Sequence, residues 1–209
     1  MRLHRYLKSC MVDAQGGVLM ANHNFWRGEK VRLRAIEQQD LDECISSPEE
    51  PDQWDERANA EIGFPVWREK DRDDTAALRQ RKDGSFEWII ENNEGQKVGY
   101  IGTFECDGRV GTFKYSIIIK RAFWRRGYGS EAIRIVLRYY FRELRYQKVT
   151  SQIYAFNEPS LRLHEKLKFL HEGRLRRMVY TNGQLHDQLM LGMTCEEFDQ
   201  LDPPMPLQP

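Results

Sequence analysis

Apolar and polar residues alternate with a period of two in several short segments of this 209-residue chain. This is the spacing of half-buried β-strands. The segments are 30–36, 86–91, 98–106 and 110–119. Turn-forming residues separate the last three of them, and Asp107-Gly108 is a strong signal for a short hairpin. The pattern therefore predicts an antiparallel meander in the first half of the chain.

The apolar period changes to about 3.6 residues directly after this meander. Over about 130–145, apolar residues recur at three- and four-residue spacing and give a helix one apolar face. The apolar face consists of Ile133, Val136, Leu137, Tyr140, Phe141 and Leu144. Four arginines (Arg134, Arg138, Arg142 and Arg145) lie away from this face, and they are most simply a solvated helix surface.

The remaining elements follow in a regular order. A strand at 148–154 precedes a short helix, for which Asn157 is a suitable N-cap. Two strands at 173–181 and 185–194 are joined by a turn at Asn182-Gly183. The elements together predict an α/β fold, in which helices flank a mixed, mostly antiparallel sheet in a single domain.

The two ends of the chain lack this regular patterning. We expect residues 1–24 to be an N-terminal extension, 25–197 to be the folded domain, and 198–209 to be a C-terminal tail. The tail ends in DPPMPLQP, and such a run of prolines neither pairs nor coils regularly. Residues 38–80 hold charged, Trp-containing helical stretches interrupted by proline and glycine.

Composition narrows the class of protein. Hydrophobic residues make up 40% and charged residues 31% of the chain, which is typical of a soluble globular domain. The formal net charge of zero does not indicate a polybasic nucleic-acid binder. No apolar run approaches the ~20 residues of a membrane span, and the N-terminus has no apolar signal region. Four scattered cysteines suggest reduced thiols, so we expect a cytoplasmic protein that contacts no membrane.

The charges are unevenly distributed along the chain. Residues 49–74 hold ten acidic and four basic side chains, whereas residues 120–145 hold eight basic and two acidic ones. One interpretation is two solvated helix faces of opposite sign. The other is a protein that holds a polyanion at one place and a cation near another.

The segment KRAFWRRGYGSEAI, residues 120–133, favours the second interpretation. A helix start offers backbone N–H groups without partners, and the helix dipole adds positive charge there. Gly127 and Gly129 would let a ligand approach the backbone, and Arg125 and Arg126 add charge suited to phosphate. A Gly-x-Gly pair alone is also compatible with a simple tight turn. The chain has neither GxxxxGK[ST] nor a third glycine in dinucleotide register, which excludes P-loop and Rossmann sites.

The run SIIIKRAFWRRGYGSEAI resembles the acyl-CoA-binding motif of the GNAT acetyltransferase superfamily. It most resembles the RimJ/RimL-like branch, which is related to ribosomal-protein N-acetyltransferases. The matching residues are Trp124, Gly127, Tyr128, Gly129, Ser130, Glu131 and Ala132. A second run, NEPSLRLHEKLKF, resembles the second motif of the branch through Asn157, Ser160, Glu165, Lys166 and Phe169. Glu172-Gly173, Arg176 and Asp187 match its closing hairpin, so the resemblance covers 25–197 and implies a GNAT-type fold.

The resemblance implies direct transfer of an acetyl group from acetyl-CoA, used as a co-substrate, to a primary amine, without a metal. The loop amides of Arg125, Arg126, Gly127, Tyr128, Gly129 and Ser130 would hold the pyrophosphate. The backbone of Ile117, Ile118 and Ile119 would bind the pantetheine arm, and an N–H there would polarise the thioester oxygen. Asn157 and Ser160 would contact the cofactor arm. Their alternative roles are a plain N-cap for Asn157 and helix-start polarity for Ser160.

Two departures from the family pattern affect the catalytic assignment. His164 replaces the usual tyrosine, which in the family is often assigned to protonate the leaving CoA thiolate. A histidine could serve as this acid, or it could be a half-buried, hydrogen-bonded structural residue. Lys168 replaces the usual glycine. We select Glu105 as the base that deprotonates the amine, with Asp107 behind it and Tyr115 as a polar neighbour. Alternatively, Glu105 is simply an exposed residue of the strand.

Several functions stay open at this stage. The leading one is an N-acetyltransferase for a peptide N-terminus, a polyamine or another small cationic amine drawn to the acidic 49–74 stretch. A different acyl donor is a second, and a catalytically inactive module that binds CoA or a protein is a third. Nucleic-acid binding through the arginine face of the 130–145 helix is disfavoured. A homodimer is compatible with the family.

Overall fold

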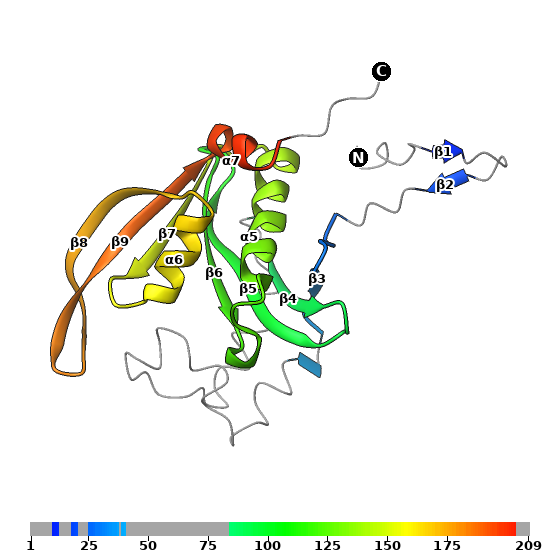
Figure 1. Cartoon of the computed structure of the whole chain (residues 1–209). Coiled ribbons are helices and arrows are strands. Elements are labelled where there is room, and N and C mark those ends of the chain that lie inside the picture. The colour runs from blue at the N-terminus through cyan, green and yellow to red at the C-terminus, as the bar shows by residue number, and fades with distance from the viewer. Residues whose placement is uncertain (1–9, 13–17, 21–24, 38, 41–83, 204–209) are drawn as a thin grey trace.

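Seven strands form one mixed sheet in the computed structural model of the chain, which describes residues 10–12, 18–20, 25–37, 39–40 and 84–203. Their order across the sheet is β3-β4-β5-β6-β7-β9-β8, and only β6 and β7 run parallel. The strands are β3 (Val31–Ala35), β4 (Glu87–Asn92), β5 (Lys97–Asp107), β6 (Thr112–Ile119), β7 (Lys148–Tyr154), β8 (Leu170–Thr181) and β9 (Gln184–Thr194). The predicted mixed, mostly antiparallel sheet is confirmed (Figure 1).

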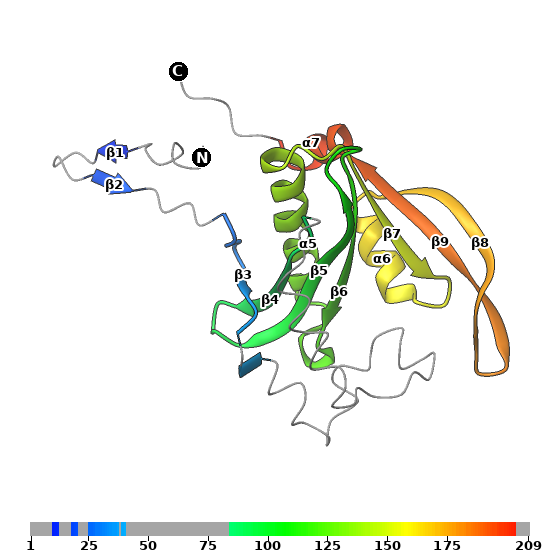
Figure 2. The ribbon, with the colours of Figure 1, turned by 180° about the vertical axis from the view of Figure 1, so that it is seen from behind.

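The helices occupy the connections between these strands. They are α5 (Tyr128–Arg138), α6 (Glu158–Lys166) and α7 (Cys195–Leu201), with a short 3-10 turn η2 (Arg121–Phe123) before α5 and a π-helical turn η3 (Tyr139–Glu143) after it. Side chains of Ile117, Ile119 and Leu163 converge on Gly129, so α5 and α6 cover the same face of β6. Figure 2 shows this arrangement from behind. A separate hairpin pairs β1 (Cys10–Val12) with β2 (Val18–Met20).

The apolar face predicted for the long helix forms the centre of the core. Ile133, Leu137 and Tyr140 are fully buried, and the ring of Tyr140 stacks on Phe113 of β6 with centroids 4.1 Å apart. Helix α5 begins two residues earlier than expected, and the end of the predicted helix is the π-helical turn. Leu144 lies beyond that turn and is 36% exposed, so the core ends at η3.

The parallel pair β6–β7 is short, and this feature positions the candidate site. Its register covers only Thr112–Lys114 against Lys148–Thr150. Beyond that point β7 pairs along its other edge with β9, over its full length. Residues 115–119 of β6 therefore have no strand partner on the β7 side within the described part of the chain, although β5 pairs with their other edge.

Strands β8 and β9 continue as a long twisted arm past the end of β7 (Figure 1). The predicted Asn182-Gly183 turn closes the arm, with φ angles of 49° and 74°. Positive φ at both positions is the geometry of a type I′ hairpin turn. The side chains of β8 are exposed along almost the whole strand, so the arm contributes little to the core.

Helix α7 was not among the predicted elements, and it crosses the boundary expected for the tail at residue 198. Thr194 and Glu197 form a capping box at its start, and Phe198 is fully buried. The Thr-x-x-Glu spacing is a known start signal that the sequence does contain. Arg138 of α5 contacts Asp202 at 2.7 Å and Arg142 contacts Asp199 at 3.3 Å. These two arginines thus bind the end of the chain instead of forming a solvated surface.

Two expectations lie outside the described residues. They are the helical stretches within 38–80, apart from residues 39 and 40, and the acidic 49–74 segment. Among the helices that the structure describes, none combines the length and the apolar character needed to cross a bilayer.

Candidate active site

The connection from β6 to α5 is held in a specific backbone conformation. Trp124 donates its indole N–H to the carbonyl of Ile119 at 2.6 Å, which fixes the start of the loop to the end of the strand. Arg125 and Gly127 both adopt left-handed backbone, with φ angles of 61° and 86°. This region costs energy for a residue with a Cβ but not for glycine, which explains the glycine at 127.

Helix α5 begins without a side-chain cap. Gly127 is the N-cap residue and has no side chain to offer, so the first N–H groups of the helix, at Tyr128, Gly129 and Ser130, have no intrahelical acceptor. The helix dipole adds partial positive charge at the same place. An unsatisfied, positively polarised helix start is suited to an anion such as a phosphate.

The two predicted arginines differ in their engagement. Arg126 donates to the carbonyl of Ala122 at 3.2 Å and lies over the ring of Phe123 at 5.4 Å, so part of its guanidinium is occupied. Arg125 is exposed, and its guanidinium has no partner among the residues that the structure describes. The structure thus places both cations at the loop, with Arg125 the less restrained.

A contact over 100 residues in sequence separation supports the loop, and sequence reasoning missed it. The carboxylate of Glu131 accepts hydrogen bonds from the backbone N–H groups of Glu29, Lys30 and Val31, at 2.7, 2.8 and 2.8 Å. A Cβ at Gly28 would lie too close to the Glu131 Cδ, so a larger residue there would displace this carboxylate. The sequence identifies Glu131 only as a residue of the family motif. Its contact with the start of β3 cannot be predicted from the spacing of residues along the chain.

The same contact brings Lys30 to the loop. Its ammonium group lies 3.3 Å from the carbonyl oxygen of Arg126, and a Cβ built on Gly127 would lie 3.1 Å from it. Lys30 was assigned no role in the sequence. The anion-facing loop therefore contains a cation from a distant strand in addition to the two predicted arginines.

The three isoleucines at the end of β6 separate into two groups. Ile117 and Ile119 point toward α5, where their side chains would lie 3.8 and 3.5 Å from a Cβ on Gly129. Ile118 points to the opposite face, as alternation along a strand requires. All three are half-buried, and their backbone edge toward β7 is not used by that strand.

His164 is buried inside the domain, with 2% of its surface exposed. Its Nδ1 lies 2.7 Å from the carbonyl of Ser160, and its Nε2 lies 2.7 Å from the hydroxyl of Tyr115. Because a carbonyl only accepts, Nδ1 carries the proton and the Tyr115 hydroxyl donates to Nε2 in the neutral imidazole. Burial lowers the pKa of His164, and the Ser160 carbonyl opposes this only in part.

Tyr115 extends this hydrogen-bonded chain to β7. Its hydroxyl also bonds to Ser151, and both residues are 5% exposed. In the register of β6 and β7 these two residues come directly after the last paired residues, Lys114 and Thr150. Burial raises the pKa of Tyr115 well above its ordinary value. The imidazole thus directs its proton to a carbonyl and its lone pair to Tyr115, which favours the structural interpretation of His164 over the acid.

The other predicted site residues on α6 have local roles. Asn157 accepts the backbone N–H of Ser160 at 3.2 Å through its side-chain oxygen, so it caps α6. Ser160 is also the residue whose carbonyl binds His164. Lys168 adopts a φ angle of 65°, in the region that favours glycine, so the glycine usual at this position of the family has a backbone reason.

Glu105 lies apart from His164. It occupies a bulge of β5 with a φ angle of 47°, its side chain is 63% exposed, and its carboxylate contacts the ammonium of Lys114 at 2.6 Å. Lys114 and Tyr115 are successive strand residues and point to opposite faces of the sheet. Because Tyr115 binds His164, the structure does not bring the two predicted catalytic residues together.

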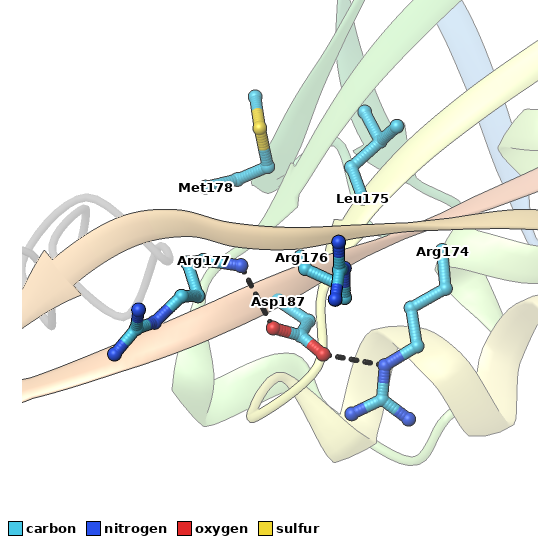
Figure 3. Close-up of a pocket in the computed structure, with 6 residues that line it drawn as sticks. All are labelled: Arg174, Leu175, Arg176, Arg177, Met178 and Asp187. Atoms are coloured by element: carbon cyan, nitrogen blue, oxygen red, sulfur yellow. Dashed lines mark hydrogen bonds and ion pairs between the residues drawn. The ribbon is translucent and has the colours of Figure 1, made fainter.

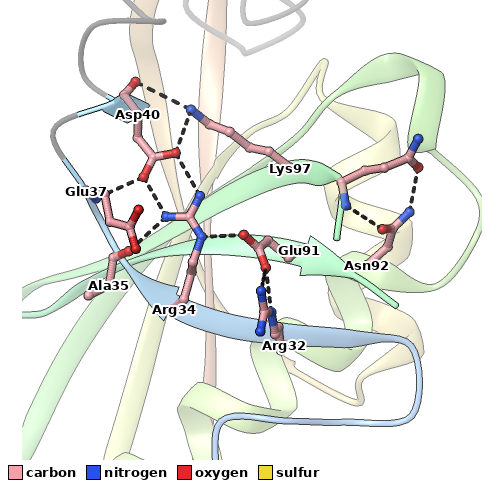
Figure 4. A network of polar contacts seen from close by, with 9 residues as sticks. Arg32, Arg34, Ala35, Glu37, Asp40, Glu91, Asn92 and Lys97 are labelled. Atoms are coloured by element: carbon pink, nitrogen blue, oxygen red, sulfur yellow. Dashed lines mark hydrogen bonds and ion pairs between the residues drawn. The ribbon is translucent and has the colours of Figure 1, made fainter. Parts of the chain in front are cut away.

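A buried charge network lies near the other edge of the sheet, where β3, β4 and β5 meet (Figure 4). Arg34 binds Asp40 through two nitrogens, at 2.6 and 2.9 Å, and also contacts Glu91; Lys97 adds a contact to Asp40 at 3.2 Å. Burial alone would raise the pKa of Asp40, but the hydrogen bonds from Arg34, the Glu37 N–H and Lys97 lower it strongly. The network borders a polar cavity of about 270 Å³ and fixes the chain just before residue 41.

A wider groove, of about 560 Å³, lies on the β8–β9 arm (Figure 3). Three residues of β8 bulge opposite Asp187, whose carboxylate accepts the Arg177 N–H at 2.8 Å and the Arg174 guanidinium at 2.5 Å. Asp187 is the predicted hairpin residue, and its contacts hold this bulge. The matching Arg176 lines the groove beside it.

Comparison with known proteins agrees with this geometry. The family described as Acetyltransferase (GNAT) domain matches residues 30–170. The SPbeta prophage-derived uncharacterized N-acetyltransferase YokL of Bacillus subtilis is 37% identical over 181 residues, covering 84% of this chain and 96% of that protein. Phosphinothricin N-acetyltransferase of Streptomyces viridochromogenes is 28% identical over 140 residues, covering 66% and 72%.

Solved structures give the same fold. Spermidine N-acetyltransferase from Vibrio cholerae, in complex with CoA and spermine, superposes with a TM-score of 0.68 at 18% identity. The match covers 82% of this chain and 99% of that one. The chain belongs to the GNAT acetyltransferase family, and its matching relatives are named N-acetyltransferases.

Proposed function

We propose that this protein transfers the acetyl group of acetyl-CoA to a primary amine by direct attack, with the 125–130 loop as the binding site of the pyrophosphate. The observation that carries this proposal is the uncapped start of α5 behind the left-handed Gly127, with Arg125 and Arg126 beside it. Family membership supplies the reaction class.

The unpaired edge of β6 gives the proposal a path for the substrate. Residues 115–119 offer backbone groups toward β7 that no described strand uses, so the pantetheine arm would bind along them as an added strand would. A backbone N–H at this edge would stabilise the negative charge that develops on the thioester oxygen. The amine nitrogen then forms the C–N bond, the C–S bond breaks, and the thiolate takes up a proton.

The amine must lose its own proton before it attacks. A polyamine nitrogen has a pKa of about 10 and a peptide N-terminus a pKa of about 8, so both are mainly protonated at neutral pH and the rate should rise with pH. We propose that solvent water accepts this proton; Glu105, whose charge Lys114 balances, is the alternative acceptor. We propose that His164 supports Tyr115 structurally. The alternative is that His164 protonates the leaving CoA thiolate.

Two features of the sequence support the proposed classes of acceptor: the acidic 49–74 segment and the family branch that the motifs resemble. A cationic small amine such as spermidine and a peptide N-terminus are the two classes we propose. The acidic 49–74 segment supports a cation, and the resemblance to ribosomal-protein N-acetyltransferases supports a peptide.

The test is a thiol-release assay with acetyl-CoA and a panel containing spermidine, an aminoglycoside, phosphinothricin and short peptides with free N-termini. Saturable thiol release with one class, and an N-acetylated product of the expected mass, would establish the acceptor. Release that does not depend on any amine would contradict acetyl transfer.

A second candidate function is a CoA-binding module without acetyltransferase activity. The burial of His164 at the family's tyrosine position favours it, because this side chain has no proton directed to an open site. Tight acetyl-CoA binding with no turnover across the panel would decide for this candidate.

A further inference from the structure

We propose that Lys30 is a direct ligand of the acetyl-CoA pyrophosphate, so that the anion site combines the α5 loop with a cation from the start of β3. This inference rests on the proposed function, and it adds a binding residue that no motif identifies. The ammonium group of Lys30 lies 3.3 Å from the Arg126 carbonyl and directly beside Gly127.

The position of Lys30 is built into the fold. Its own backbone N–H, and those of the residues before and after it, bind the carboxylate of Glu131 in the first turn of α5. Asn93 holds the same turn from the β4 side, since its side-chain amide donates to the Glu29 carbonyl at 2.7 Å. Gly28 allows the close approach. The backbone of Lys30 is therefore fixed to the helix that carries the anion-facing N–H groups.

The chemistry of this arrangement points to a strongly charged ligand. Glu131 uses its charge on backbone N–H groups, so no carboxylate among the described contacts of Lys30 neutralises the ammonium. Among the described residues, the ammonium contacts a carbonyl oxygen, and this contact leaves two of its three donors for other acceptors. A lysine in this state is a point-charge ligand of the kind that binds phosphates.

The test compares acetyl-CoA with a donor that lacks phosphates. Acetyl-CoA is titrated calorimetrically into the wild type, Lys30→Gln and Lys30→Arg, and S-acetylpantetheine is assayed as an acetyl donor for each. Lys30→Gln keeps a donor for the Arg126 carbonyl but removes the charge. We expect about a tenfold weaker acetyl-CoA affinity for this variant, near-normal affinity for Lys30→Arg, and an unchanged KM for S-acetylpantetheine in both.

Salt dependence provides a second readout. Removal of a phosphate contact should reduce the slope of log Kd against log salt for acetyl-CoA, because fewer ions are displaced on binding. Arg109→Gln, an exposed arginine in the turn between β5 and β6, is the control and should change neither affinity nor slope. Thermal melts check that all variants are folded.

Three results would overturn the inference. One is wild-type affinity in a folded Lys30→Gln variant. Another is an equal loss for S-acetylpantetheine, which would make Lys30 a general support of the loop. A wild type that does not bind acetyl-CoA at all would remove the proposed function itself, and this outcome is distinct from the first two.

Discussion

Two regions of the site differ in whether their polar groups have hydrogen-bond partners. At the α5 loop the first backbone N–H groups lack acceptors within the helix, Gly127 has no Cβ, and three cations lie nearby. At the His164 cluster every polar group has a partner, from the Ser160 carbonyl through the imidazole and Tyr115 to Ser151. The first region is prepared to receive charge, and the second is closed.

The difference shows how a family motif divides into binding and support. Unsatisfied polar groups are costly inside a protein, whereas exposed N–H groups at a helix start bind water and can bind an anion in its place. A buried, fully paired chain indicates a structural role, whatever residue type it contains. The substitution of His164 for the family's tyrosine thus changes a side chain inside a closed network, whereas the glycine loop keeps the family pattern.

The largest expected effect comes from closing the open region. Gly127→Glu forces a residue with a Cβ into a φ of 86° and adds negative charge at the anion site. We expect acetyl-CoA affinity to fall on the order of 100-fold, measured as the loss of the acetyl-CoA-induced rise in Tm. Gly183→Glu is the matched control, since it has a φ of 74° with no atom within 4 Å of its Cβ position. A similar loss in both variants would contradict a specific role for the loop.

Removing the support of the open region is expected to cost stability as well as affinity. Glu131→Ala leaves three N–H groups without their carboxylate. We expect the free energy of unfolding to fall by about 2 kcal/mol in urea denaturation, with weaker acetyl-CoA binding because Lys30 is released. Glu158→Ala is the control, as its first-turn carboxylate has only an exposed pair with Arg162 and should cost less than about 0.5 kcal/mol. Equal costs in the two variants would show that the contact is unimportant.

The closed region is tested by removing its central acceptor. His164→Phe leaves the buried Tyr115 hydroxyl without the imidazole, so we expect a loss of about 2 kcal/mol in the free energy of unfolding. Adding Tyr115→Phe should recover part of that loss, which a double-mutant cycle would measure. If His164→Phe instead keeps its stability and loses turnover by more than ~100-fold, the residue is the acid and the comparison fails.

The protonation state of His164 gives a pH dependence of known sign. Its pKa in the folded protein is lowered by burial, whereas the unfolded chain has the ordinary value of ~6.5. The unfolded state therefore binds more protons below pH ~6.5, and stability should decrease as pH falls through this range. Asp40 and Glu91 lose their contribution only below pH ~4, because their folded pKa values are lowered too. Urea midpoints of the wild type and His164→Gln between pH 5 and 7 check this; parallel curves would contradict it.

The smallest effect is expected at Glu105. Its carboxylate is 63% exposed and paired with Lys114, and such exposed pairs contribute little. Glu105→Gln should change kcat/KM for the best amine by less than about threefold at pH 8. A loss of two orders of magnitude that is recovered at higher pH would assign Glu105 as the base and move the catalytic centre to its face of the sheet.

The fold was largely predictable because its signals are local. The alternation at 98–106, the helix face around Ile133 and the Asn182-Gly183 turn each depend on residues close in sequence. Helix α7 was not predicted, although its capping box is also local. The proline-rich end placed the expected start of the tail at residue 198, before the end of this helix.

The site was predictable only in part, for a physical reason. The glycine loop carries its function in the backbone, so its composition identifies it. The Glu131–Lys30 contact and the Ser151–Tyr115–His164 chain join residues far apart in sequence, and only the packing of β3, β6 and β7 against the helices brings them together. The role of His164 depends on what surrounds it, which one sequence does not state.

The open loop at the start of α5 is the proposed binding site of acetyl-CoA. Calorimetric titration of the purified, folded protein with acetyl-CoA tests it most directly. We expect saturable binding of one acetyl-CoA per chain, weakened by salt. No heat of binding at millimolar acetyl-CoA, from protein shown to be folded, would contradict it.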